Sequence, residues 1–245
     1  MGLSVLRRKQ PPSRLPEGVR IYAIGDVHGR ADLLDQVLTR IDGHLAAHPV
    51  DRPIQVLVGD YIDRGPNSRE VLDRLIERAG SSKMVLLKGN HETFVLEFLR
   101  DPSMLQSWGQ MGGLETLMSY GVTPSLDADA QTQKELAIAL QATLPKSHLT
   151  LLEGLRSSFS CGGFFFAHAG VRPGVPLAEQ RDADLLWIRD EFLRYEGKFD
   201  KIIVHGHTPV RVVDMRPNRI NIDTGAYATG KLTCIVIERN EVEVL

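Results

Sequence analysis

Five short clusters in the sequence combine glycine with residue types that bind metal ions or phosphate. Three of them occupy residues 25–29, 59–65 and 89–92, and two more begin at His168 and His205. Each cluster follows an apolar run typical of a buried β-strand. Ligands gather beyond the carboxyl ends of strands in open α/β sheets, so we expect the five clusters to meet at one site.

The clusters supply a mixed set of nitrogen and oxygen donors without a thiolate. Such a set favours Mn²⁺, Fe or Zn²⁺ at a reactive site over a cysteine-rich structural zinc site. One Gly-Asp pair or one histidine after a strand would be ordinary turn chemistry, but five of the eight histidines lie in these clusters. Two ions about 3.5–4 Å apart can clamp a phosphate, and a carboxylate such as Asp60 can bridge them. The clusters offer two aspartates, three histidines and one asparagine amide oxygen as ligands, about as many as two ions need.

Composition excludes several classes of protein. Lys and Arg number 29 against 31 Asp and Glu, so we expect no nucleic-acid-binding surface. Hydrophobic residues make up 42% and charged residues 24%, as in ordinary globular proteins. The apolar runs are far shorter than the roughly 18–20 residues of a membrane helix, so no membrane association is expected. Cys161 and Cys234 form no Cys-x-x-Cys motif, which favours a cytoplasmic protein with both thiols buried as packing residues. The sequence leaves the oligomeric state open.

The elements that must position the clusters can be read from periodicity. Residues 31–48 carry apolar side chains at helical spacing and predict an amphipathic helix. A second helical stripe, between Val71 and Ile76, follows Asn67 and Ser68, either of which can cap a helix. Strands alternating with helices indicate an α/β sheet. Buried strands are predicted at 19–24, 54–58, 84–87, 164–167 and 202–204.

Other patterns mark the start, the middle and the end of the chain. Residues 1–17 mix prolines with arginines and predict a flexible leader before a single domain at 18–245. Residues 101–160 show helical periodicity without a strand signal, so we expect a helical insertion in that domain. Beyond residue 210, short β-rich segments separated by turn residues predict an antiparallel meander.

Three of the clusters resemble the signatures of one known family, the phosphoprotein-phosphatase-type binuclear metallophosphoesterases, which are calcineurin-like. Those signatures are Gly-Asp-x-His-Gly, Gly-Asp-x-x-Asp-Arg-Gly and Gly-Asn-His-Glu, and all three occur here without substitution. The segments 168–170 and 206–208 match as well. Residues 223–226 resemble the ending of bacterial and bacteriophage lambda-type serine/threonine protein phosphatases. The resemblance covers about residues 20–238, with 101–160 aligned loosely.

The resemblance implies an α/β (α+β) fold, a four-layer α/β/β/α sandwich with a centre for two divalent ions at the sheet edge. Mn²⁺ is the expected metal, with Fe or Zn²⁺ as alternatives. His205 is not a usual ligand position and is expected either to support a ligand from behind or to be structural. The implied ligands of the first ion are Asp26, His28 and Asp60. Those of the second ion are Asp60, Asn90, His168 and His207.

The resemblance also implies a mechanism, in-line attack on phosphorus by a hydroxide that bridges the two metals. His91 would protonate the leaving alkoxide, with Asp63 orienting its imidazole. Arg64 and Arg189 would hold the phosphoryl oxygens, since guanidinium groups match phosphate geometry.

Two further substrate-binding candidates rest on looser matches. Lys88 stands where many relatives have an arginine, and its ammonium lacks the bidentate fork. Tyr227 stands near a tyrosine of the eukaryotic protein phosphatases, whose Ser-Ala-Pro-Asn-Tyr-Cys segment is absent here.

These residues leave three possible functions to compare. The first is a metal-dependent phosphoprotein phosphatase acting on phosphoserine or phosphothreonine, with phosphotyrosine left open. The second is a symmetrical diadenosine tetraphosphate hydrolase, which shares the fold and most motifs but usually reads Gly-Asn-His-Asp where this chain has Glu92. The third is a silent phosphate-binding scaffold, which the intact pair of His91 and Asp63 disfavours.

Overall fold

Two five-stranded sheets form the centre of the protein, whose computed structural model describes residues 14–125 and 127–245. The first sheet has the order β10-β9-β1-β2-β3, and the second has the order β4-β5-β6-β8-β7. The first consists of β1 (Val19–Ile24), β2 (Arg52–Leu57), β3 (Met84–Leu86), β9 (Cys234–Glu238) and β10 (Glu241–Val244). The second consists of β4 (Ser158–Cys161), β5 (Phe164–Ala167), β6 (Ile202–His205), β7 (Asp214–Met215) and β8 (Arg219–Asn221).

Parallel strands lie at the middle of both sheets and fix where the loops emerge. In the first sheet β1, β2 and β3 run parallel, while β9 pairs antiparallel with β1 and β10. In the second sheet β5, β6 and β8 run parallel, with β4 and β7 as antiparallel edges. The loops after the parallel strands therefore leave the sheets in a common direction within each sheet.

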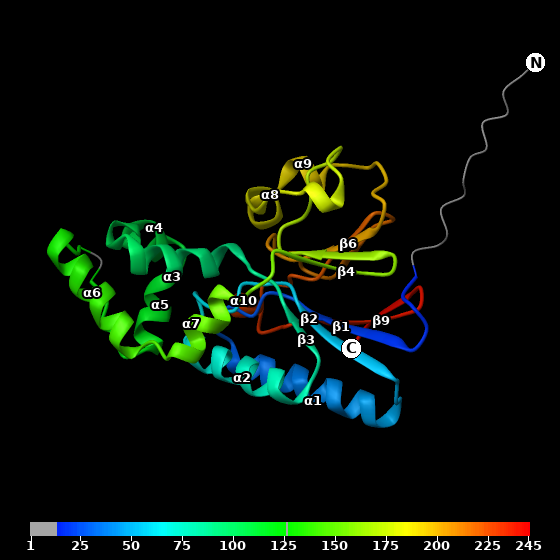
Figure 1. The fold of residues 1–245 in the computed structure, drawn as a ribbon, viewed down its shortest axis with the longest axis horizontal. Coiled ribbons are helices and arrows are strands. Elements are labelled where there is room, and N and C mark those ends of the chain that lie inside the picture. The colour runs from blue at the N-terminus through cyan, green and yellow to red at the C-terminus, as the bar shows by residue number, and fades with distance from the viewer. Residues whose placement is uncertain (1–13, 126) are drawn as a thin grey trace, which may run out of the picture.

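Alternation along the strands divides the apolar side chains into layers. Ile21 and Ala23 of β1 join Phe164 and Phe166 of β5 in the core between the sheets. The intervening Tyr22 and Ile24 face the helices on the outer side of the first sheet. Successive side chains of a strand point to opposite faces, so each buried strand serves two cores. The predicted four-layer α/β/β/α sandwich is confirmed (Figure 1).

Helices cover both outer faces. Figure 1 shows α1 (Ala31–Ala47) and α2 (Ser68–Ser81) along the first sheet, with α8 (Asp182–Trp187) and α9 (Asp190–Leu193) on the opposite side over the second. The short α10 (Ala226–Thr229) lies in the crossing from β8 to β9.

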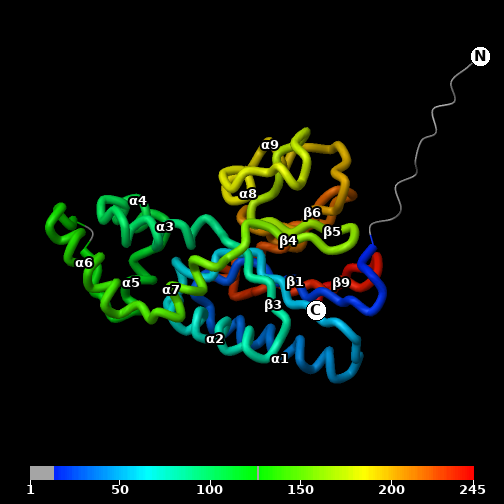
Figure 2. The backbone as a smooth tube through the Cα atoms, viewed as in Figure 1, coloured from blue at the N-terminus to red at the C-terminus, as the bar shows by residue number. Residues whose placement is uncertain are grey.

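The helices at residues 90–153 gather into one helical lobe beside the sandwich, drawn in green in Figure 2. Trp108 is fully buried in it and packs on Phe98, with ring centroids 5.2 Å apart. The predicted helical insertion is thus present. Its elements are α3 (Asn90–Arg100), a 3₁₀ turn (Pro102–Met104), α4 (Leu105–Gln110), α5 (Gly113–Ser119), α6 (Ala130–Thr143) and α7 (Lys146–Glu153).

Two sequence-based expectations about strands are wrong. The last residues of the predicted insertion form β4, which pairs antiparallel with β5 across a turn at 162–163. The C-terminal segments do not form one meander, because β7 and β8 complete the second sheet while β9 and β10 complete the first. Local alternation predicts that a segment is a strand, but the choice of sheet depends on contacts distant in sequence.

Most of the predicted leader lies outside the described residues, and its described end is packed. Leu15 is buried, and its backbone N–H donates to the carbonyl of Arg239 at 2.7 Å. Cys234 is buried as expected, whereas Cys161 on the edge strand β4 is only half-buried. Among the described residues, no helix combines the length and hydrophobicity that crossing a membrane requires.

Candidate metal centre

The loops after β1, β2, β3, β5 and β6 meet at one edge of the sandwich, as their positions after parallel strands predict. The carbonyl of Asp60 accepts from the backbone N–H groups of Val27 and His28 at 3.0 and 2.8 Å. A Cβ on Gly89 would lie 2.1 Å from Oδ1 of Asp60, so only glycine lets the third loop approach the second this closely.

Two groups of possible metal ligands share Asp60. The ligand atoms of His28, Asp60 and His91 lie within 4.8 Å of one another, and so do those of Asp60, His168 and His207. Nε2 of His28 and Nε2 of His168 lie 3.5 and 3.4 Å from Oδ2 of Asp60. One carboxylate thus faces both groups, which is the arrangement a bridging ligand requires.

Backbone carbonyls fix the tautomers of two of these histidines. Nδ1 of His28 lies 3.0 Å from the carbonyl of Ile62, and Nδ1 of His168 lies 3.0 Å from that of Val58. A carbonyl only accepts, so each Nδ1 carries a proton, and Nε2 of each ring faces Asp60. Metal-ligating histidines are commonly oriented in this way.

Asn90 and Asp26 complete the oxygen donors. Oδ1 of Asn90 lies 2.9 Å from both Nε2 of His168 and Nδ1 of His207. One carboxylate oxygen of Asp26 accepts from the backbone N–H of His207 at 2.9 Å, whereas its Oδ1 is buried and has no hydrogen-bond partner among the described residues. An unpaired buried carboxylate oxygen is costly, and a cation would satisfy it. The donor set therefore fits divalent metal ions.

Burial and charge make this edge suited to cations. Burial lowers the pKa of His28 and of His207 to about 3, so both imidazoles are neutral. Burial and the neighbouring Asp223 raise the pKa of Asp26 well above its usual range. At His168, burial opposes protonation, but the Asp60 carboxylate outweighs it and raises the pKa to about 10. The buried carboxylates attract positive charge, which divalent ions would supply.

Strained backbone concentrates at the same edge. Among the described residues other than glycine, those with positive φ are His28, Asp60, Asp63, Arg64, His207 and Arg239. All but Arg239 belong to the clusters. The left-handed region costs roughly 1–3 kcal/mol for such residues and persists where the surroundings impose it. The fold thus holds these side chains in place at the expense of local stability.

His91 contacts Asp63, and Asp63 is in turn held by side chains that the sequence did not reveal. Its Nδ1 lies 2.7 Å from Oδ2 of Asp63. The Trp108 indole N–H donates to the same oxygen at 2.9 Å, and the Thr116 hydroxyl donates to Oδ1 at 2.6 Å. Burial alone would lower the pKa of His91, but Asp60 and Asp63 outweigh it and raise the pKa. Trp108 and Thr116 come from the helical lobe, 45 and 53 positions from Asp63 and outside every motif.

Glu92 holds the backbone of two of these loops together through hydrogen bonds. Its Oε2 accepts from the backbone N–H groups of Asp60 and Gly89 at 3.0 and 2.8 Å, and its Oε1 accepts from that of Tyr61 at 2.8 Å. The side chain is fully buried. Glu92 therefore supports the loop backbone, and its identity gives no direct reading of a substrate.

Two predicted phosphate-binding arginines lie beside the ligand groups. Nη2 of Arg64 is 3.1 Å from Nε2 of His91, and Nε of Arg189 donates to Nε2 of His207 at 3.2 Å. The guanidinium of Arg64 also lies over the ring of Tyr227, 4.9 Å from its centroid. Tyr227 is 40% exposed and meets His28 edge-on at 5.5 Å. Arginines and an aromatic ring thus stand at the rim of the candidate centre.

Two other predicted residues do not join the ligand groups. Nζ of Lys88 lies 3.9 Å from the exposed Asp182 carboxylate, and within the described residues it forms no ion pair with the candidate ligands. His205 is buried against Phe192, with ring centroids 4.9 Å apart, and lies outside both possible ligand groups. The expected structural position of His205 agrees with this packing.

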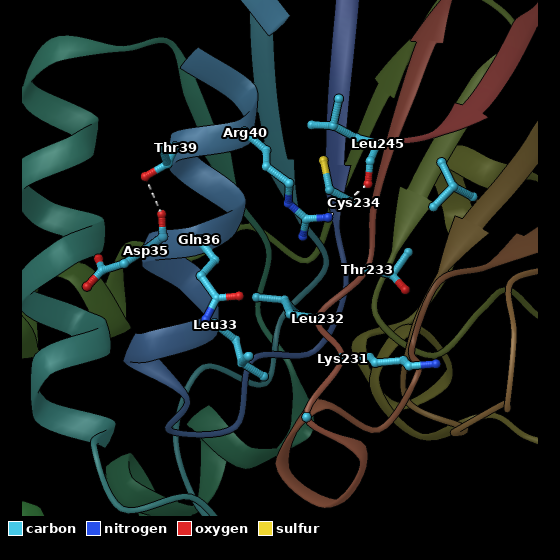
Figure 3. A pocket seen from close by; sticks show the side chains of 12 residues that line it. Leu33, Asp35, Gln36, Thr39, Arg40, Lys231, Leu232, Thr233, Cys234 and Leu245 are labelled. Atoms are coloured by element: carbon cyan, nitrogen blue, oxygen red, sulfur yellow. Dashed lines mark hydrogen bonds between the residues drawn. The ribbon is translucent and has the colours of Figure 1, made fainter. Parts of the chain in front are cut away.

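A pocket separate from the candidate centre opens between α1 and the segment leading into β9 (Figure 3). Its volume is about 730 Å³, and none of the predicted site residues lines it. Arg40 reaches across it, where its Nη1 donates to the carbonyl of Leu245 at 3.1 Å.

Comparisons with known proteins agree with this architecture. The family model of calcineurin-like phosphoesterases matches residues 19–244. The asymmetrical bis(5'-nucleosyl)-tetraphosphatase PrpE of Anoxybacillus flavithermus is 28% identical over 232 residues, which cover 86% of this chain and 88% of the relative. A crystal structure provisionally described as a diadenosine tetraphosphatase has a TM-score of 0.63 and 21% identity, covering 92% of both chains. The cold-active protein-tyrosine phosphatase of a psychrophilic Shewanella has a TM-score of 0.56 and 16% identity, covering 95% of this chain and 83% of that one. At such identities the two structures support the fold alone.

Proposed function

Because the chain belongs to the calcineurin-like phosphoesterase family, we propose that it hydrolyses dinucleoside tetraphosphates asymmetrically, in a reaction that depends on divalent metal ions. One observation carries the hydrolytic part of the proposal, namely the two groups of ligands that share Asp60. The substrate class is suggested by relatives named as asymmetrical bis(5'-nucleosyl)-tetraphosphatases, which are 24–29% identical to this chain. The names of these relatives support asymmetrical cleavage in place of the symmetrical cleavage weighed from the sequence.

The residues that would hold the ions are those expected from the motifs. Asp26, His28 and Asp60 would bind one ion, and Asp60 with Asn90, His168 and His207 would bind the other. Divalent ions at such a site polarise phosphoryl oxygens and make a water molecule nucleophilic at neutral pH. Mn²⁺ suits this donor set, with Fe or Zn²⁺ as alternatives.

The remaining polar side chains would bind the substrate and move a proton. Arg64 and Arg189 would clamp the phosphoryl oxygens from opposite ligand groups, since their guanidinium nitrogens lie 3.1 and 3.2 Å from His91 and His207. Nε2 of His91 would donate a proton to the leaving oxygen, and Asp63 would keep the imidazole oriented through Nδ1. Tyr227 would hold the Arg64 guanidinium in place through a cation–π contact with its ring.

Asymmetrical cleavage adds water across one phosphoanhydride bond at an end of the tetraphosphate. The water oxygen bonds to phosphorus, the P–O bond to the bridging oxygen breaks, and the products are a nucleoside monophosphate and a nucleoside triphosphate. The leaving oxygen belongs to a phosphate chain, which is far less basic than an alkoxide. Such a substrate demands less of the general acid than a phosphoserine does.

A second candidate, a phosphoprotein phosphatase, is favoured by the buried Asp63–His91 pair at 2.7 Å. Asp63 keeps the imidazole protonated and oriented, and such a general acid serves the poorer alkoxide leaving group of phosphoserine or phosphothreonine. Phosphotyrosine would need it less, because a phenolate is the better leaving group.

The test is product analysis with the Mn²⁺-loaded protein. Diadenosine tetraphosphate and phosphoserine, phosphothreonine and phosphotyrosine peptides are supplied separately, and kcat/KM is compared. We expect AMP and ATP in equal amounts from the dinucleotide, with slower phosphate release from the peptides. ADP as the sole nucleotide product would establish symmetrical cleavage, and faster release from the peptides would favour the second candidate.

A further inference from the structure

Exposed aromatic rings gather at the rim of the candidate centre. Among the large hydrophobic side chains that are exposed in the described residues, the aromatic ones are Trp187, 43% exposed, and Tyr227, 40% exposed. Trp187 meets His207 edge-on with ring centroids 6.1 Å apart, and Tyr227 meets His28 at 5.5 Å. Each exposed ring therefore borders a different group of ligands.

Trp187 is fixed in place while a large part of its surface stays in solvent. It is the last residue of α8, and the next side chain, Ile188, is buried. Phe94 of the helical lobe meets the indole edge-on, with centroids 6.0 Å apart and an interplanar angle of 85°. His207 meets it at 82°, and no aromatic ring of the described residues stacks parallel on it. The indole is thus held by its neighbours and free to stack on a planar ligand.

The residue after Ile188 adds a phosphate-binding group beside this ring. Nε of Arg189 donates to Nε2 of His207 at 3.2 Å, so its guanidinium and the Trp187 indole both lie against the same imidazole. A planar apolar surface next to a guanidinium and a candidate metal ligand matches a nucleotide, which joins a planar base to phosphate through one ribose.

The second exposed ring differs from the first. The guanidinium of Arg64 lies 4.9 Å from the centroid of Tyr227, over its face. A base stacking on that side would have to displace a cation that the phosphate also needs. Trp187 is therefore the better stacking surface of the two.

We propose that Trp187 stacks against the base of the nucleoside whose phosphate is cleaved, with Arg189 on that phosphate. This inference rests on the proposed function, because it assigns the binding site of one nucleoside in that substrate. Stacking of a base on an aromatic side chain corresponds to roughly a 5- to 150-fold effect on affinity.

The first test uses the intrinsic fluorescence of the two tryptophans. Trp108 is fully buried and Trp187 is exposed, so only the latter can stack on a ligand. The protein, in a fixed excess of Mn²⁺, is titrated with AMP and, separately, with ribose 5-phosphate, which lacks the base. We expect AMP to quench the fluorescence and ribose 5-phosphate to leave it unchanged. Trp187→Phe should abolish the quenching and keep the emission of Trp108.

The second test compares substrates with and without a purine. Trp187→Ala should lower kcat/KM for diadenosine tetraphosphate by roughly 5- to 150-fold and change that for p-nitrophenyl phosphate little. Trp187→Phe should restore most of the loss. Val212→Ala, at a side chain 74% exposed, serves as the control and should change neither.

The outcomes separate this inference from the proposed function. If AMP fails to quench, if ribose 5-phosphate quenches equally, or if Trp187→Ala slows both substrates alike, Trp187 is not a base-stacking residue. If the protein cleaves p-nitrophenyl phosphate but no dinucleotide, the proposed function fails. AMP quenching that depends on Trp187 would in that case still support the stacking surface.

Discussion

The candidate metal centre and the helical lobe are built in opposite ways. The centre draws its side chains from loops and from the first turn of α3, spread over residues 26–207, whereas the lobe beyond that turn is one continuous helical stretch that ends at residue 153. The centre consists of motifs and strained backbone, and the rest of the lobe consists of amphipathic helices outside any motif. They meet at Asp63, whose carboxylate accepts hydrogen bonds from Trp108 and Thr116. Motifs thus specify the chemistry, while side chains of the lobe outside any motif orient one of its key groups.

The largest expected effect comes from the carboxylate that both ligand groups share. Asp60→Asn should deplete both metal ions and lower kcat by at least about 10³-fold, because a neutral amide is a poor bridge between cations. Elemental analysis and turnover of the purified variant measure this. Asp35→Asn, at an exposed aspartate of α1, is the matched control. Two ions per chain in Asp60→Asn would contradict the bridging role.

Next in size is the loss of the proposed general acid. His91→Asn should lower kcat for a phosphoserine peptide by roughly 10²–10⁴-fold while both metals stay bound. The loss should be smaller for diadenosine tetraphosphate, whose leaving oxygen is less basic. Parallel kinetics on the two substrates check this. Loss of metal in the variant would instead show that His91 is a metal ligand. This role would agree with its position beside His28 and Asp60 in one group of possible ligands.

The contribution of the lobe is tested at Thr116. Thr116→Val removes the 2.6 Å hydrogen bond to Asp63 at nearly constant volume. Hydrogen bonds to charged groups contribute about 1.5–3 kcal/mol, so we expect kcat to fall roughly 10- to 100-fold with little change in KM or metal content. Thr143→Val, whose hydroxyl bonds only backbone carbonyls of α6, is the matched control. Equal kinetics in the two variants would show that the lobe does not orient Asp63.

The smallest expected effect concerns stability alone. The Tyr120 hydroxyl bonds Nδ1 of the buried His148 at 2.7 Å, and Nε2 of His148 lies 2.9 Å from Asp73 of α2. Tyr120→Phe should lower the free energy of unfolding by about 1–2 kcal/mol without changing kcat, because this link joins the lobe to α2 away from the metal ligands. Urea unfolding and steady-state kinetics measure the two quantities. A parallel fall in kcat would show that the attachment of the lobe also controls the site.

Sequence reasoning succeeded wherever a local pattern has one structural solution. The strands at 19–24 and 164–167 have the predicted bounds, because short β-rich runs between turn signals leave little alternative. It failed at β4 and at the C-terminal strands, where the residues fit a strand but their neighbours come from distant parts of the chain. The candidate ligands could be predicted because each lies within a motif. Trp108 and Thr116 were missed because a tryptophan and a threonine in an amphipathic helix are indistinguishable from packing residues.

The types of the chemical groups and their order along parallel strands follow from the amino-acid sequence, and so does the edge at which these groups collect. Which atoms face one another depends on folding. The carbonyls of Ile62 and Val58 set the orientation of the His28 and His168 rings. The loops packed on Asp60 impose its positive φ. Asp63 is oriented by side chains more than forty positions away. These interactions join segments that are distant in sequence. They form only when the chain folds, because its contacts must together offset the conformational entropy lost on ordering.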